Sequence, residues 1–153
     1  IDVLEPYQYY AGLALNWMLF GSSSHRERPP GGILSNYNKC AKNSHIKTIV
    51  NTNYTVNALN PHFFNYQEGT YVVDTAYQRV DGPWNKQVGE IPPDYLFDIA
   101  YINHYVVKSY ADFKRKIARG SAQGIKKPLW FFNWIDINMT DTCDYLTPRK
   151  IDR

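Results

Sequence analysis

The sequence contains little that would cross-link the chain or hold it in a membrane. Its 153 residues include only two cysteines, Cys40 and Cys143, which excludes both a disulfide framework and a multi-cysteine zinc site. One disulfide between them stays open, because the spacing neither favours nor forbids it. No apolar run approaches the length of a membrane-spanning helix. We therefore expect no membrane span in this chain.

Neither sign of charge dominates, and several well-known catalytic motifs are absent. Lys and Arg number 17 against 14 Asp and Glu, a net charge of +3, which is too small an excess to predict nucleic-acid binding. The basic run KRKIAR at 114–119 is typical of a solvated helix face. The chain has no G-x-S-x-G and no glycine-rich phosphate loop, which argues against a serine-hydrolase triad and against P-loop or Rossmann nucleotide binding.

What the sequence does have is aromatic residues. They make up 16% of the chain, with 13 Tyr and 4 Trp, and 44% of all residues are hydrophobic. This composition and length predict one globular domain over residues 1–153. Tyr and Trp offer flat surfaces with a polar group at one end, which suit sugar rings and protein partners alike. The composition therefore favours a binding site without naming its ligand.

The order of apolar and polar segments predicts a mixed α/β domain. The nearly continuous apolar run at 11–20 is typical of a strand covered on both faces, and the Gly, Ser and Pro residues of 21–32 indicate a loop after it. Ser109 can cap a helix that ends before Gly120. We also expect a helix over 33–42 and strands over 46–51, 69–78 and within 95–106.

A histidine and a lysine lie at the junction between the strand expected within 95–106 and the helix that Ser109 can cap. In the segment INHYVVKS, His104 precedes Lys108 by four residues. A neutral imidazole can bind a metal, and a lysine just before a helix N-terminus can meet a phosphate group. The alternative is a buried histidine with satisfied hydrogen bonds and a lysine that extends to solvent. Spacing alone does not decide between these two interpretations.

The first strand and the loop after it contain a second set of candidates. Small hydroxyl residues can hydrogen-bond a polar ligand, an arginine can meet an anion, and a tryptophan can stack on a sugar. A flexible polar loop is the alternative interpretation. The candidate binding residues in this stretch are Trp17, Ser22, Ser23, His25 and Arg28.

The segments NWMLFGSSSHRERPPGG, KTIV, NPHFF, YVVDT and INHYVVKSYADFKRKIARGSA together resemble the C-terminal part of glycosyltransferases of the family-2 and family-92 type. The family pattern contains W-x-x-F-G-S-S-G-H, R-P, K-x-I-V, P-H and H-Y-x-x-K-S in the same order. The resemblance covers nearly the whole chain. It departs at Ser24, where the family usually has glycine before the histidine that matches His25.

The resemblance implies a GT-A-like mixed sheet with flanking helices, without part of the N-terminal nucleotide-binding half. It implies sugar transfer from a nucleotide diphosphate sugar to a glycan or glycoconjugate hydroxyl, assisted by Mn²⁺ or Mg²⁺ and with inversion at the anomeric carbon. His104 matches a metal-binding position and Lys108 would face the phosphates. An inverting enzyme needs a carboxylate base, for which Asp74 and Glu27 are the candidates.

The D-x-D segment of that family is not found in this chain, so we expect a piece of a longer enzyme that is inactive alone and able to form oligomers. A cytoplasmic location is expected, unless the longer enzyme is anchored to a membrane. The alternative function is a non-catalytic carbohydrate-binding or assembly domain, in which Trp17 and Trp84 would stack on sugars.

Overall fold

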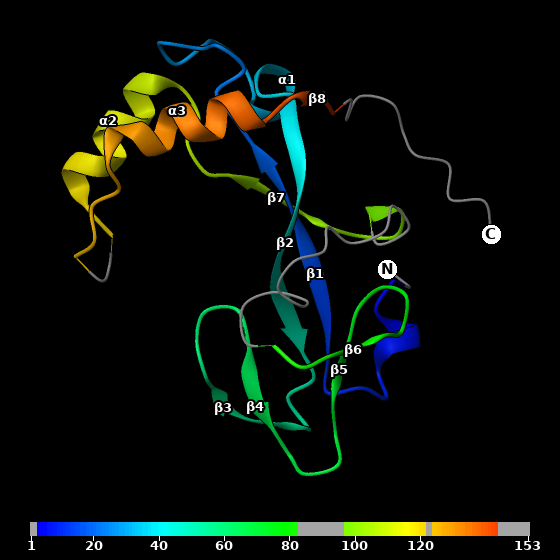
Figure 1. Cartoon of the computed structure of the whole chain (residues 1–153). Helices are drawn as coiled ribbons and strands as arrows, with labels where there is room; N and C mark the ends of the chain where they lie inside the picture. Colours follow the sequence, from blue (N-terminus) through cyan, green and yellow to red (C-terminus); the bar gives the residue numbers. More distant parts are fainter. Residues whose placement is uncertain (1–2, 83–96, 122–123, 144–153) are drawn as a thin grey trace. The chain divides into compact units, whose positions relative to one another are not determined.

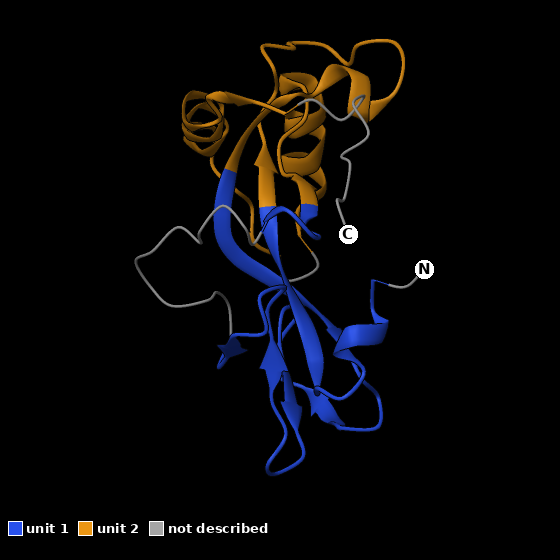
Figure 2. Cartoon of the chain, turned by 90° about the vertical axis from the view of Figure 1, so that its right-hand side faces the viewer, with its two compact units in different colours: residues 1–17, 42–102 blue, residues 18–41, 103–153 orange. Residues whose placement is uncertain are grey.

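The computed structural model describes residues 3–82, 97–121 and 124–143. The chain divides into two compact units, residues 1–17 with 42–102 and residues 18–41 with 103–153, shown in separate colours in Figure 2. Two long strands contribute residues to both units. They are β1, Gly12–Phe20, and β2, Lys39–Val50.

The described residues form a mixed α/β fold, as the sequence predicted, and the main sheet contains both parallel and antiparallel pairs (Figure 1). Its strands lie in the order β6-β5-β1-β2-β8, and β7 also pairs with β1. β1 is parallel to β5, whereas β6 and β8 are antiparallel to their neighbours β5 and β2. The remaining bounds are β5 Val72–Val73, β6 Arg79–Val80, β7 Ile102–Tyr105 and β8 Asp141–Thr142.

In the first unit, β1 is covered on both faces. Leu13 and Leu15 pack with Val73 on one side, and Ala14 packs with Ile46 on the other. This confirms the interpretation of the continuous apolar run as a buried strand. The unit also contains the short 3-10 helix Glu5–Tyr7 and the hairpin of β3, Thr55–Ala58, and β4, Phe64–Tyr66.

In the second unit, the helix after His104 is confirmed. α2 spans Tyr110–Arg119; Ser109 is its N-cap and Gly120, at φ +76°, ends it. Phe113 is fully buried, and its ring packs against those of Phe131 and Phe132 from α3. α3 spans Leu129–Asn138. The two helices are therefore held together by aromatic side chains.

The second unit also contains a disulfide between Cys40, in β2, and Cys143, just after β8. The pairing of β2 with β8 brings the two cysteines together, because Cys40 lies opposite Asp141 in that ladder. The disulfide that the spacing left open is thus formed.

Two predicted elements are shorter than the sequence indicated. The helix expected over 33–42 is only α1, Ile33–Asn36, because the chain enters β2 at Lys39 and the ladder with β8 replaces the helix. The strand expected over 69–78 is limited to β5, because Asp74 begins a turn in which its Oδ1 accepts hydrogen bonds from the backbone N–H groups of Ala76 (2.8 Å) and Gln78 (3.0 Å).

A cationic cavity beside α2

Positive side chains gather around one cavity of the second unit, which we call the cationic cavity. It has a volume of about 390 Å³. One carboxylate, Asp112, also lies in its wall, and the rest of the lining comes from the end of β7 and the segment after it. The cationic residues that line it are Arg28, Lys108, Arg115, Lys116 and Arg119.

The helix delivers most of these residues because of their spacing. Asp112, Arg115, Lys116 and Arg119 follow one another at intervals of three, one and three residues, so they share a face of α2. The sequence contained this signal in KRKIAR, but a basic helix face is also the ordinary surface of a solvated helix. The basic face of α2 becomes a cavity wall because Lys108 and Arg28 also line the cavity.

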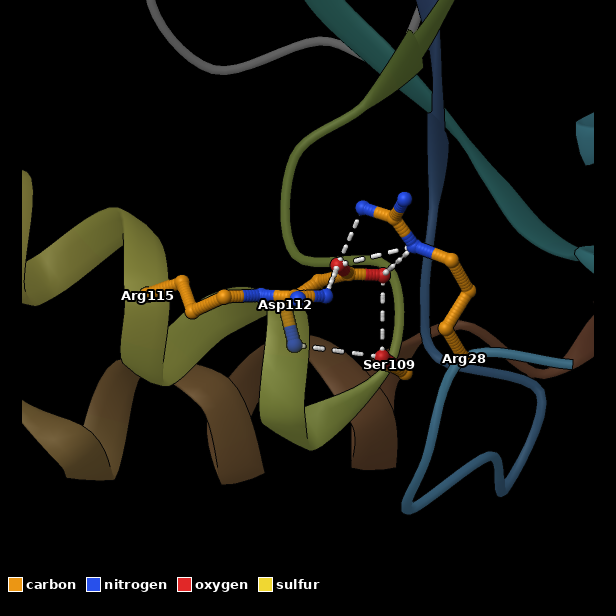
Figure 3. A network of polar contacts seen from close by, with 4 residues as sticks. All are labelled: Arg28, Ser109, Asp112 and Arg115. Atoms are coloured by element: carbon orange, nitrogen blue, oxygen red, sulfur yellow. Dashed lines mark hydrogen bonds and ion pairs between the residues drawn. The ribbon is translucent and has the colours of Figure 1, made fainter.

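Asp112 organises the cavity wall (Figure 3). Arg28 donates to it from Nη2 (2.6 Å to Oδ1) and from Nε (3.1 Å to Oδ1 and 3.3 Å to Oδ2). Arg115 forms a second ion pair with Oδ1, and the Ser109 hydroxyl donates to Oδ2 (3.0 Å). The hydrogen bonds from Arg28 are the main cause that lowers the pKa of Asp112 to about 2. The carboxylate therefore stays ionised and holds two guanidinium groups in place.

The loop of residues 21–32 closes the N-terminus of α2. The backbone N–H of Tyr110 donates to the carbonyl of His25 (3.1 Å), and that of Ala111 donates to Arg26 (2.9 Å). The N–H of Asp112 donates to the Ser109 hydroxyl (3.1 Å). These N–H groups of the helix end are therefore already bonded and are not available to a phosphate group. Anion binding in the cavity must depend on side chains.

Lys108 lines the cavity with an unusual backbone. Its φ is +59°, in the left-handed region that side chains with a Cβ adopt at a cost of about 1–2 kcal/mol. Glycine would fit this position with less strain. A strained lysine facing other cations is the kind of conformational outlier that occurs at functional sites.

Within the cationic cavity, the charged form of Lys116 is disfavoured by its surroundings. Burial lowers its pKa, and the positive charges of Lys127, Arg119 and Lys108 lower it further. Its ammonium donates to the carbonyl of Val106 (2.7 Å), which leaves other ammonium hydrogens for a ligand. An anion in the cavity would relieve this repulsion, so the arrangement favours binding of a multiply charged anion.

A buried hydroxyl lies beside the cationic cavity. Arg28, Lys108 and Asp112 also line a smaller cavity of about 180 Å³, together with Tyr37. Tyr37 is only 3% exposed, and its hydroxyl has no hydrogen-bond partner within the described part of the chain. A buried polar group of this kind is costly unless something bonds to it.

The serine and histidine candidates of the loop have structural contacts. The N–H of Ser22 donates to Asp136 Oδ1 (2.8 Å), and the Ser23 hydroxyl accepts from the N–H groups of Asn38 (2.9 Å) and Lys39 (3.0 Å). The Nε2 of His25 lies 3.0 Å from the carbonyl of Asn36. These contacts fix the loop, and none of the three residues lines the cationic cavity.

The remaining candidates lie elsewhere. Glu27 is exposed and lines an open groove with Lys114 and Arg115. His104 is half-buried in β7 and is not among the residues that line the cationic cavity. Trp17 and Asp74 belong to the first unit, where the Trp17 ring stacks on His45 and Asp74 is buried in its turn. Trp84 lies outside the described residues.

The cationic cavity does not fit a divalent metal ion. Mn²⁺ and Mg²⁺ prefer several carboxylate, carbonyl or water oxygens, whereas the one carboxylate here is bonded to two arginines. Among residues 3–82, 97–121 and 124–143, no group of three or more His, Cys, Asp or Glu side chains could hold a metal. The metal role of His104 stays a prediction.

No family model, no curated protein and no solved structure matches the chain. Within the described residues, no helix is both long and apolar enough to cross a membrane.

Replacing Ser109 by alanine should lower the free energy of unfolding by about 1 kcal/mol, because the N-cap hydroxyl that accepts from Asp112 N–H is lost. Urea denaturation measures this change. Ser35→Ala, at an exposed serine in α1, is the control and should change stability by no more than about 0.5 kcal/mol. Equal effects of the two substitutions would contradict the capping role.

Acid should weaken the second unit through Asp112. Because its pKa falls from 3.8 to about 2, its contribution is fully present above pH 3.8 and is lost as the pH falls toward 2. Thermal melts of wild type and Asp112→Asn should therefore differ most above pH 4 and converge near pH 2. Asp81→Asn, which breaks an exposed pair with Arg79, should give a small difference that hardly changes with pH.

Proposed function

We propose that the chain binds the diphosphate group of a nucleotide sugar and is part of a glycosyltransferase. The cationic cavity carries this proposal, with five Lys or Arg side chains against one carboxylate. Arginine and lysine are the usual partners of phosphate oxygens, and bonds between ionised groups are stronger than neutral ones. The nucleotide sugar is suggested by the resemblance of the sequence to family-2 and family-92 glycosyltransferases.

The cations would act on the leaving group. When the bond from the sugar to the diphosphate breaks, negative charge grows on the phosphate oxygen that departs. Positive groups already fixed in place stabilise that charge without moving. Arg28 and Arg115 are held by Asp112, so these two guanidinium groups are organised before the ligand binds.

The acceptor hydroxyl needs a carboxylate to take its proton in an inverting transfer. Glu27 is the more accessible candidate, because it is exposed in a groove beside the Arg28 and Arg115 side chains. Asp74 has one carboxylate oxygen engaged by two backbone N–H groups of its turn. No step is assigned to Mn²⁺ or Mg²⁺, since the cavity does not fit them.

The disulfide bears on where the protein works. Disulfides persist in oxidising compartments and are uncommon in the cytoplasm. The bond between Cys40 and Cys143 therefore favours an oxidising compartment over the cytoplasmic location that we expected from the sequence.

Calorimetric titration of the chain with UDP, ADP and inorganic diphosphate tests the proposal. We expect all three anions to bind, and Lys108→Gly to bind them at least about tenfold more weakly, because one charge-assisted contact is lost. Its unfolding free energy should fall by no more than about 0.5 kcal/mol, since glycine relieves the left-handed backbone.

Lys114→Ala is the matched control, because it removes a lysine from the same helix outside the cationic cavity. It should leave the affinity for diphosphate within about twofold. Release of nucleotide diphosphate from a panel of nucleotide sugars then tests transfer or hydrolysis. Binding of free sugars with no binding of any diphosphate would favour the carbohydrate-binding alternative and contradict the proposal.

A further inference from the structure

α3 is apolar on the side that faces away from its packing partners. Its inward side is formed by Phe132 and Ile135, and Met139 follows directly after the helix; all three are buried. The opposite side we call the outer face of α3. It consists of Leu129, Trp130, Asn133, Trp134 and Ile137.

The outer face exposes three large apolar side chains, two of them tryptophans. Trp130 is 65% exposed, Trp134 is 50% exposed and Ile137 is 74% exposed. The three residues follow one another at intervals of four and three residues, so they form one stripe along the helix. An exposed apolar stripe of this kind indicates a contact surface.

Phe131 lies at the edge of the outer face, because its ring also packs against Phe113 of α2, and it connects the tryptophans of that face to a cation. The ring of Phe131 lies 6.3 Å from that of Trp130 and 6.3 Å from that of Trp134. The ammonium of Lys127 lies 3.8 Å from the centre of the Phe131 ring. This amine therefore lies against apolar ring surface, and its partial burial lowers the pKa of Lys127. Lys126, next to it, is exposed.

The outer face has no negative charge of its own. The acidic residue of α3, Asp136, accepts a hydrogen bond from the backbone of Ser22 and so belongs to the inward side. Tryptophan beside apolar side chains, with lysines at the edge, is typical of helices that lie in the interface of a membrane. With ten residues, α3 is about 15 Å long, too short to span a bilayer.

We propose that the outer face of α3 binds the surface of a membrane that contains anionic lipids. Trp130, Trp134 and Ile137 would lie among the lipid headgroups and upper acyl chains, and Lys126 and Lys127 would meet lipid phosphates. Charge complementarity favours this occupant over a second copy of the chain, because anionic lipids supply the negative charge that would pair with Lys126 and Lys127, whereas the outer face of a second copy has none. The proposal is independent of the glycosyltransferase function.

Sedimentation with vesicles tests it. The full chain should sediment with vesicles of phosphatidylcholine and phosphatidylglycerol, and much less with phosphatidylcholine alone. Trp130→Ser/Trp134→Ser should weaken binding about a hundredfold, because the inserted apolar area is lost. Lys126→Ala/Lys127→Ala should weaken it at least about tenfold, and the wild type should lose affinity as salt rises.

Val56→Ser/Leu59→Ser is the matched control, since it removes two exposed apolar side chains from the first unit and should leave vesicle binding unchanged. Equal sedimentation of the tryptophan variant and the wild type would overturn the proposal, because the cationic cavity alone would then explain the binding. A dimer in solution that the tryptophan variant abolishes, with no vesicle binding by the wild type, would also overturn it and assign the face to a second copy.

Discussion

Replacing Cys40 and Cys143 by alanine should lower the free energy of unfolding by about 4–5 kcal/mol. The two cysteines are 103 residues apart, and a cross-link that closes a loop of roughly this length removes a large part of the freedom of the unfolded chain. Because many domains are stable by only about 5–15 kcal/mol, this loss would leave the variant close to unfolding. Urea denaturation monitored by tryptophan fluorescence measures it.

The wild type in reducing agent is the control for this experiment. It should lose stability by a similar amount, because reduction breaks the same bond without changing a side chain. Cys40 is 1% exposed, so alanine is preferred to serine, which would bury a hydroxyl there. A variant as stable as the oxidised wild type would show that the disulfide does not stabilise the fold.

The sequence predicted well those elements whose pattern depends on local chemistry. The helix from Tyr110 to Arg119 was recognisable because Ser109 caps it and Gly120 ends it. β1 was recognisable because both of its faces are buried. In both cases, the residues that decide the structure lie within the element itself or directly beside it.

Elements that depend on distant partners were less predictable. The apolar spacing after Ile33 favoured a helix, yet β2 begins at Lys39 because β8, about a hundred residues later, pairs with it. Asp74 looked like one residue of a longer strand, and its side chain instead closes a turn. Tertiary pairing and side-chain bonds to the backbone outweighed local preference in these two places.

The candidate site was predicted only in part, for a related reason. The sequence placed Lys108 at a helix start and Arg28 in the loop, and the structure brings both to one cavity. It could not indicate that the loop would occupy the N–H groups of the helix end. The sequence also could not show that Arg115, Lys116 and Arg119 line a cavity. From their spacing alone they form an ordinary solvated helix face, and the difference depends on the residues from other segments that line the same cavity.

Phe113→Ala should lower the free energy of unfolding by about 3–5 kcal/mol and also weaken diphosphate binding. The ring is fully buried and packs against Phe131 and Phe132 of α3, so its removal leaves a cavity that the surrounding aromatic rings cannot fill. Phe113 lies on the helix that carries Lys116, and a loosened helix would hold that cation less firmly. Urea denaturation measures the first effect and calorimetric titration with diphosphate the second.

Phe113→Leu separates packing from aromatic character. It keeps most of the buried volume, so it should cost less than the alanine variant and leave diphosphate affinity within about threefold. Because the affinity is measured where each variant is folded, a weaker affinity of Phe113→Ala reports the position of the cations rather than the folded fraction. If the alanine variant binds diphosphate as tightly as wild type, the packing of α2 on α3 stabilises the fold without positioning the cationic cavity.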